Sequence, residues 1–218
     1  MMVHVVIAAR GGVSSKWRCR EALCGDRRAA LVRAMLADMI AACRRTPGIE
    51  RIWVATPSHD LAGIAEKAGA TPLFETDGSG LNDAFAAARN QVAAIDPAAT
   101  TLLLPGDLPL LDPSDVATVV ATHRADEAVL VAATGDGGTG AILLPAGVPF
   151  AFAYGRNSFA RHLAAARASG LAPRVVDAPS MAFDLDRPSD IARILSGRST
   201  GRTRALLASF QVSKDVAV

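Results

Sequence analysis

The sequence predicts an α/β fold, a single-domain, doubly wound and mostly parallel sheet, and three observations lead to this fold class. Short apolar runs alternate along the chain with longer segments in which apolar residues recur at helical spacing. One run, at residues 100–104, is too short for a helix and is typical of a strand buried on both faces, as in parallel sheets. The chain has 218 residues, half of them apolar, which suffices for one α/β domain with a full core.

The expected strands are bounded by turn residues and the expected helices by caps and breakers. Gly69 ends the second helix, Pro113 opens the fourth and Gly170 ends the fifth. Residues after Gly197 are expected to form a weak helix or a disordered tail, and residues 134–159 an insertion that covers the site. The strands are expected at residues 3–8, 51–55, 71–74, 100–104, 128–132, 141–144 and 174–176, and the helices at 27–43, 61–68, 81–95, 113–123, 158–169 and 189–195.

Composition excludes several classes of protein. A net charge of +2 is too small to indicate nucleic-acid binding. Cys19, Cys24 and Cys43 form no CxxC pair, so free thiols in a reducing cytosol are expected. The first strand runs directly into a basic loop, unlike a signal peptide, and no apolar stretch reaches the roughly 20 residues that span a bilayer. We expect a soluble, cytoplasmic protein, and apolar surface on its alanine-rich helices would allow a homodimer.

Three carboxylates are the main candidates for chemistry. Asp107 follows the buried strand at 100–104 and is itself followed by Pro109, which places it at the carboxyl edge of the sheet, where open α/β sheets bind ligands. Asp184 and Asp186 lie two residues apart and would face the same side of an extended segment. Three carboxylates without a Cys/His cluster favour a hard cation such as Mg²⁺, which usually bridges to substrate phosphates.

The loop after the first strand is basic and rich in glycine. Gly11 would let the backbone approach a phosphate, and Arg10, Lys16 and Arg18 could neutralise its charge. The loop matches neither GxxxxGK[ST] nor GxGxxG, which excludes the P-loop and dinucleotide motifs. An ordinary strand-to-helix loop with cations facing solvent is the alternative.

Further polar segments precede two of the helices. Asn82 could cap the helix at 81–95 or read a nucleobase or ribose. The Gly-rich stretch 135–140 is typical of a hairpin turn, and the turn at 154–159 opens a helix. Two such amide-rich turns near one carboxylate site would suit a small phosphorylated acid. His162 is interpreted as a surface or packing histidine. No nucleophile motif such as GxSxG is present, which argues against covalent catalysis.

Together these segments resemble the CofC/FbiD family, the guanylyltransferases of coenzyme F420 biosynthesis, from residue 3 to about 195. The LPGDLPL run alone indicates only the broader nucleotidyltransferase superfamily, and the Gly-Gly-Thr and YGxxSFxRH segments narrow it to this family. The segments that carry the resemblance are LPGDLPL at 104–110, G-L-N at 80–82, DGGT at 136–139, YGRNSFARH at 154–162 and DLDRPSD at 184–190.

The resemblance implies a fold, a reaction and a set of site residues. Residues 1–196 would form a nucleotidyltransferase domain with a Rossmann-like, MobA-like fold. A phosphorylated three-carbon acid would attack the α-phosphate of GTP and release diphosphate. The roles implied by residue are Mg²⁺ binding by Asp107, Asp184 and Asp186; catalysis by Asp107, Lys16 and Arg18; GTP binding by Ala8, Arg10, Gly11, Gly80 and Asn82; and acid binding by Thr139, Gly155 and Ser158.

The chain departs from the family pattern at two positions, and two alternative functions remain open. Arg10 stands about where the family usually has Lys, and Gly140 where members often have Asn, which predicts a different acid specificity or a looser site. Another nucleotidyltransferase of this fold, of the molybdenum-cofactor or sugar-phosphate type, is one alternative, and a non-catalytic nucleotide-binding protein is the other. The sequence leaves open whether the acid is 2-phospho-L-lactate, phosphoenolpyruvate or 3-phosphoglycerate.

Overall fold

The computed structural model describes residues 2–11, 19–75, 80–135, 137–197 and 200–215, the last five as backbone only. These residues build a seven-stranded sheet in the order β3-β2-β1-β4-β6-β5-β7. β6 is antiparallel to β4 and β5, and the other pairs are parallel. The strands are β1 (Val3–Ala8), β2 (Ile49–Thr56), β3 (Thr71–Phe74), β4 (Thr100–Pro105), β5 (Glu127–Ala132), β6 (Thr139–Leu144) and β7 (Ala172–Val175).

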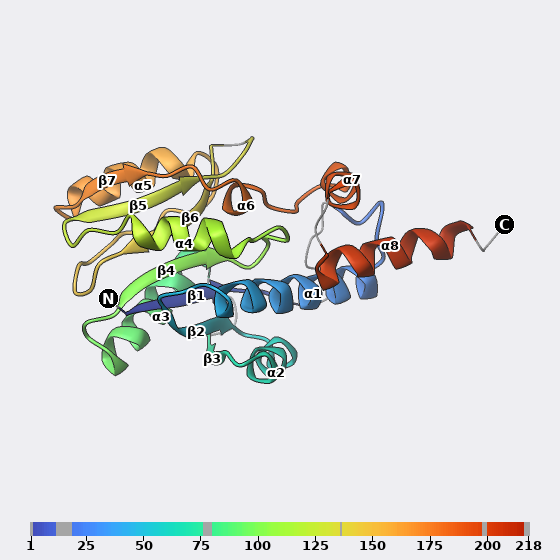
Figure 1. Cartoon of the computed structure of the whole chain (residues 1–218), viewed down its shortest axis with the longest axis horizontal. Coiled ribbons are helices and arrows are strands. Elements are labelled where there is room, and N and C mark those ends of the chain that lie inside the picture. The colour runs from blue at the N-terminus through green and yellow to red at the C-terminus, as the bar shows by residue number, and fades with distance from the viewer. Residues whose placement is uncertain (1, 12–18, 76–79, 136, 198–199, 216–218) are drawn as a thin grey trace.

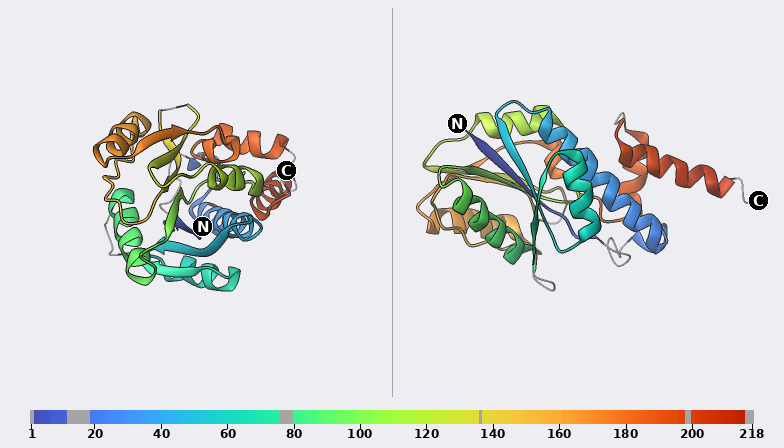
Figure 2. Two further views of the ribbon diagram at one scale, coloured as in Figure 1. Left: turned by 60° about the vertical axis from the view of Figure 1, so that its left-hand side comes forward. Right: turned by 90° about the horizontal axis from the view of Figure 1, so that it is seen from below.

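Helices cover both faces of this sheet (Figures 1 and 2). One face packs against α1, α2, α4 and α6, and the other against α3 and α5. Long α8 packs beside α1 and extends to one end of the molecule in Figure 1. The helices are α1 (Gly25–Arg44), α2 (His59–Ala68), α3 (Leu81–Ile95), α4 (Pro113–Ala121), α5 (Ser158–Ala168), α6 (Pro179–Ala182), α7 (Pro188–Ser196) and α8 (Arg202–Asp215).

The central strands are buried on both faces because successive side chains alternate between two cores. In β4, Leu102 and Leu104 enter the core beneath α1, whereas Leu103 enters the core beneath α3. All six residues of β1 are likewise buried. This explains why the central strands have continuous apolar runs, and it confirms the fold class that the sequence predicts.

The carboxyl ends of β1, β2 and β4 meet at one edge of the sheet, because these strands are parallel. Antiparallel β6 begins at the same edge, so Thr139 lies beside the end of β4. The topology therefore brings the loop after β1, the turn holding Asp107 and the start of β6 together at one edge.

Most element limits agree with the prediction to within two residues, and those of β1, β3 and α3 agree fully. The short helix α6 was not predicted. The interpretation of residues 134–159 as an insertion is wrong, because β6 is an integral strand between β4 and β5. Residues 202–215 form α8, whose first amides, at Arg202 and Thr203, donate to the Asp38 carboxylate at 2.9 and 2.8 Å. These two bonds explain how the start of α8 is held against α1.

Two expectations drawn from composition can be compared with the structure. Cys19, Cys24 and Cys43 are free thiols, as predicted. Burial raises the pKa of Cys43 to about 12, so this thiol stays protonated and inert. Among the described residues, no helix combines the length and apolar character needed to cross a bilayer.

Candidate active site

The three predicted carboxylates converge. Asp107, Asp184 and Asp186 each offer an oxygen, and these oxygens lie within 4.8 Å of one another. A backbone hydrogen bond of 3.1 Å from the amide of Leu185 to the carbonyl of Asp107 holds the two segments side by side. Leu185 is fully buried, so its two neighbours face the opposite side, as the alternation of an extended segment requires. This geometry agrees with the sequence prediction that the three carboxylates point into one site.

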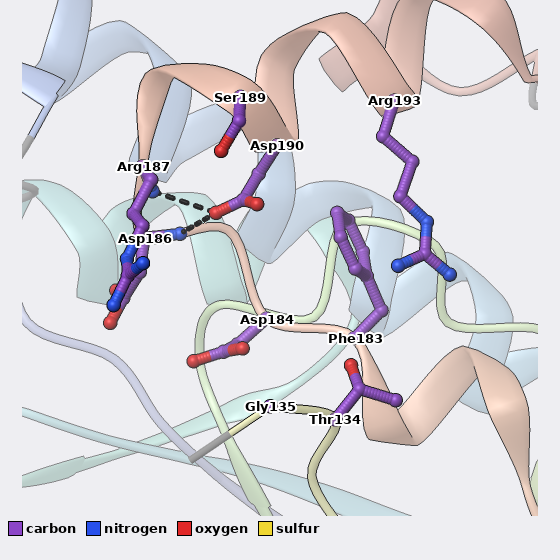
Figure 3. A pocket seen from close by; sticks show the side chains of 9 residues that line it. All are labelled: Thr134, Gly135, Phe183, Asp184, Asp186, Arg187, Ser189, Asp190 and Arg193. Carbon is purple, nitrogen blue, oxygen red and sulfur yellow. Dashed lines mark hydrogen bonds between the residues drawn. The ribbon is translucent and has the colours of Figure 1, made fainter.

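The neighbouring helix α7 fixes the acidic segment (Figure 3). The carboxylate of Asp190 accepts hydrogen bonds from the amides of Asp186 and Arg187 at 2.9 and 2.7 Å. The Cys19 thiol donates to the carbonyl of Asp186 at 3.4 Å. Asp184 and Asp186 also line a cavity of about 320 Å³, together with residues of α7 and the end of β5. The capping of α7 thereby sets the backbone path of the candidate metal ligands.

The carboxylate cluster suits a hard divalent cation. Mg²⁺ is held at about 2.0–2.1 Å by oxygen ligands, so ligands on opposite sides of the ion lie roughly 4.2 Å apart. Oxygens that all lie within 4.8 Å of one another are compatible with that geometry. No thiol or imidazole takes part in this group, which disfavours zinc. The described residues therefore fit Mg²⁺, which stays a prediction.

The turn after β4 lies directly on the end of β1. The amide of Gly106 donates to the carbonyl of Ala8 at 2.8 Å. A Cβ on Gly106 would lie 2.7 Å from that carbonyl oxygen and 2.9 Å from Ala9. Only glycine permits this approach, which holds Asp107 at the edge of the sheet. Ala8 was predicted to contact GTP, and in this structure its carbonyl bonds to Gly106.

The predicted phosphate loop after β1 is described only in part. Arg10 forms an ion pair of 3.0 Å with Glu75, which follows β3. Gly11 lies against α2, where a Cβ would approach Leu61 at 3.1 Å. Lys16 and Arg18 lie outside the described residues, so their expected role in catalysis stays a prediction.

Asn82 binds backbone rather than capping its helix. Its carbonyl oxygen accepts from the amide of Tyr154 at 2.6 Å, and its amide donates to the Tyr154 carbonyl at 3.4 Å. The N-cap of α3 is Gly80, whose amide bonds to the carboxylate of Asp83 at 3.2 Å. Asn82 thus ties α3 to the turn before α5. Its predicted contact with the nucleotide is not tested.

The predicted acid-binding residues meet at the start of β6 and α5. The hydroxyls of Thr139 and Ser158 lie 3.1 Å apart, and Gly155 belongs to the turn that leads into α5. Gly155 has φ +123°, a conformation that other residues rarely adopt. Its carbonyl accepts from the amide of Ser158 at 3.1 Å. The structure therefore brings all three residues together.

Two side chains that the sequence did not assign to the site lie beside this group. His162 is fully buried and bonds to Thr139, so it is a packing histidine as predicted and not a surface one. Tyr154 packs between Phe85 and His162, at ring distances of 5.1 and 4.7 Å. Both residues belong to the YGxxSFxRH segment that carries the resemblance, but only the tertiary contacts show that they lie beside Thr139.

The hydroxyl of Tyr154 is buried, and it has no hydrogen-bond partner among the residues that the structure describes. Burial, and then the charge of Asp107, raise the pKa of Tyr154, so the phenol stays protonated. It is therefore a donor near the carboxylates. Buried hydroxyls usually find partners, which makes a bound ligand the natural acceptor here.

Replacing Tyr154 with Phe should separate stability from activity. The ring contacts remain, and removing a buried hydroxyl without a partner should leave the free energy of unfolding unchanged or raise it by about 1 kcal/mol. Catalytic efficiency should fall about tenfold if the phenol donates to a substrate. Chemical denaturation and steady-state kinetics on Tyr154→Phe measure both quantities. A loss of stability would show that the hydroxyl has a partner within the protein.

Gly140, one of the two departures from the family pattern, faces a neighbouring backbone. A Cβ at this position would lie 2.0 Å from the carbonyl oxygen of Met181 in α6. Backbone, not empty space, occupies the place of a side chain. The predicted difference in acid specificity, or looser site, at Gly140 stays a prediction.

Comparison with known proteins agrees with this geometry. A family model described as "Guanylyl transferase CofC like" matches residues 3–217. The chain is 40% identical to the 3-phospho-D-glycerate guanylyltransferase of Phenylobacterium zucineum, over 96% of this chain and 97% of the relative. It is 33% identical to the phosphoenolpyruvate guanylyltransferase of Conexibacter woesei, over 95% of this chain and 96% of the relative.

A solved structure supports the fold. The chain superposes with a TM-score of 0.74 on a protein from Desulfovibrio desulfuricans described as a nucleotide-diphospho-sugar transferase, covering 97% of this chain and 96% of that one. The sequence identity is 16%, so this likeness concerns the fold alone. It confirms the nucleotidyltransferase-like fold that the resemblance implied.

Proposed function

This chain belongs to the guanylyl transferase CofC-like family, and we propose that it transfers GMP from GTP to a phosphorylated three-carbon acid in coenzyme F420 biosynthesis. Diphosphate is the leaving group. The observation that carries the proposal is the convergence of Asp107, Asp184 and Asp186 at the edge of the sheet where β6 begins with Thr139, which bonds to Ser158. A cluster that can hold a metal, next to hydroxyls that can bind an anion, suits a reaction between two phosphates.

The reaction needs positioning and charge neutralisation more than proton transfer. The phosphate of the acid is already ionised at neutral pH, so an oxygen of that group can attack the α-phosphorus of GTP without a general base. The bond from the α-phosphorus to the bridging oxygen breaks, and diphosphate departs with the electron pair. Asp107, Asp184 and Asp186 would hold Mg²⁺, which neutralises charge on the phosphoryl oxygens when bound.

The acid is bound in this proposal between β6 and α5. Thr139, Ser158 and the amide-rich turn at Gly155 supply neutral donors, which suit a carboxylate or phosphate. Asn82 supports this turn from α3 by its two bonds to Tyr154. Lys16 and Arg18, in the loop after β1, are proposed to neutralise the triphosphate.

Among the three acids that the sequence leaves open, the relatives favour 3-phospho-D-glycerate. The relative that is 40% identical carries this acid in its name, whereas the phosphoenolpyruvate relatives compared are 31–36% identical. We propose 3-phospho-D-glycerate as the acceptor, with phosphoenolpyruvate and 2-phospho-L-lactate as the comparison substrates.

Diphosphate release tests the proposal directly. Purified protein is incubated with GTP, Mg²⁺ and each of the three acids in turn, and diphosphate and the guanylated product are measured. We expect turnover with 3-phospho-D-glycerate and little with CTP or ATP in place of GTP. Release with phosphoenolpyruvate alone would correct the acid. No release with any acid, together with measurable GTP binding, would overturn the proposed function.

A further inference from the structure

His162 forms two short hydrogen bonds inside the fold, one from each ring nitrogen. Nε2 lies 2.8 Å from the backbone amide of Ala153, and Nδ1 lies 2.8 Å from the hydroxyl oxygen of Thr139. The ring is fully buried and packs edge-on against Tyr154. Ala153 and Tyr154 belong to the segment that Asn82 ties to α3, so the imidazole joins that segment to β6.

These contacts determine which nitrogen carries the proton. A backbone amide can only donate, so Nε2 of His162 must accept. Burial, and then the charge of Arg161, lower the pKa of His162 to about 4, so the ring is neutral at physiological pH. A neutral ring whose Nε2 accepts carries its hydrogen on Nδ1. His162 therefore donates to the hydroxyl oxygen of Thr139.

The direction of this bond decides what Thr139 and Ser158 can offer a ligand. Two hydroxyls carry two hydrogens, and the 3.1 Å bond between them uses one. Because His162 donates its own Nδ1 hydrogen to Thr139, it takes up neither hydroxyl hydrogen. One hydroxyl hydrogen is therefore left over. The opposite tautomer would take a hydrogen from Thr139 and leave the pair with lone pairs only, which repel an anion. No other hydrogen bond joins either hydroxyl to a described residue.

We propose that His162 is a positioning residue, whose fixed Nδ1–H tautomer keeps one hydroxyl hydrogen of the Thr139 and Ser158 pair free to donate to the anionic group of the acid substrate. The inference rests on the proposed function, because it assigns the pair to that substrate. Both hydroxyls are buried, so the remaining hydrogen needs an acceptor from a ligand. His162 acts through Thr139 and is not itself a catalytic residue.

Two substitutions at His162 test the role of the Nδ1 donor separately from that of the imidazole ring. In His162→Asn the amide nitrogen can occupy the place of Nδ1 and still donate to Thr139. In His162→Gln the longer side chain reaches the place of Nε2, where it can accept from Ala153, but it has no donor at Nδ1. We expect His162→Gln to raise the KM for the acid about tenfold, because without the Nδ1 donor the Thr139 hydroxyl can rotate and the remaining hydrogen of the pair is no longer directed at the acid. His162→Asn should restore most of that loss. The KM for GTP should stay within about twofold in both.

A matched control is available at His123. This histidine is partly buried, and its Nε2 lies 3.4 Å from the hydroxyl of Thr100, at the opposite edge of the sheet. His123→Asn should leave the KM for the acid unchanged. Melting temperatures of all variants identify any that fail to fold, and nitrogen-15 NMR of the wild-type ring reads the tautomer directly. Protonation of Nε2 in the wild type at neutral pH would overturn the inference even if no variant folds.

Calorimetry with 3-phospho-D-glycerate, in the presence of GTP and Ca²⁺ to suppress turnover, distinguishes the two proposals. Binding that weakens in His162→Gln and recovers in His162→Asn supports the positioning role. Binding that is equal in all three proteins overturns this role and leaves the proposed function standing. Binding that depends on His162 without any turnover under Mg²⁺ overturns the proposed function alone. Absence of binding to the wild type with all three acids overturns both.

Discussion

Asp107→Asn should lower the turnover number about 10³-fold while the protein stays folded. Asn keeps the shape of the side chain but removes one of the three negative charges that lie within 4.8 Å of one another. A divalent cation would be held less tightly and less well positioned by two carboxylates than by three, and a loss of about 4 kcal/mol in transition-state stabilisation is about three orders of magnitude in rate. Diphosphate release at saturating GTP and acid measures the effect.

Stability and binding identify the cause of this loss. Relief of repulsion between carboxylates should keep the melting temperature of Asp107→Asn at or above that of the wild type. Affinity for GTP without metal should change little. Asp126→Asn, an exposed position before β5, is the matched control and should keep full activity. Retention of turnover in Asp107→Asn would remove the carboxylate of Asp107 from the mechanism.

The parts of the site that the sequence predicted depend on local signals. Asp107 follows an apolar run, and a run of that length and composition indicates a buried strand wherever it occurs. Asp184 and Asp186 alternate around Leu185, and alternation fixes which side chains share a face. Neither signal requires knowledge of the partner segment. The topology of a doubly wound sheet then brings them to the same edge.

The parts that the sequence did not predict depend on contacts between distant segments. Asn82 was expected to cap a helix or contact the nucleotide, but its side chain binds the backbone of Tyr154, 72 residues further on. The tautomer of His162 depends on the amide of Ala153 in a loop without regular structure. α6 has only four residues, too few for a helical pattern of apolar residues to show.

Gly140→Ala should destabilise the fold by about 3 kcal/mol or more, because the added Cβ would lie 2.0 Å from the carbonyl oxygen of Met181. Backbone atoms lie on both sides of this contact, so moving them apart to relieve the clash costs free energy. β6 is held between β4 and β5, and α6 is anchored by the amide and hydroxyl of Thr134, which both donate to the carbonyl of Ala182 at 2.7 and 2.9 Å. For a chain of this size, the melting temperature should fall by about 6–12 °C.

Gly63→Ala is the matched control, and the opposite sign is expected there. Gly63 lies inside α2, and a Cβ at this position meets nothing within 4 Å. Alanine favours a helix interior by about 0.8–1.0 kcal/mol over glycine, so this variant should melt at a higher temperature. A Gly140→Ala variant that melts with the wild type would show that β6 and α6 are further apart than the structure has them.

Gly140→Ala is expected to affect activity as well as stability. Thr139 precedes Gly140 on β6, and α6 leads directly into Phe183 and the acidic segment at 184–186. Any shift that relieves the contact between β6 and α6 should therefore move the hydroxyl of Thr139 or the carboxylates of Asp184 and Asp186. We expect Gly140→Ala to lose activity even below its melting temperature, whereas Gly63→Ala keeps it. Gly140 is adjacent to Thr139, and Met181 precedes Asp184 by three residues, so a disturbance of this backbone contact should reach both parts of the proposed site.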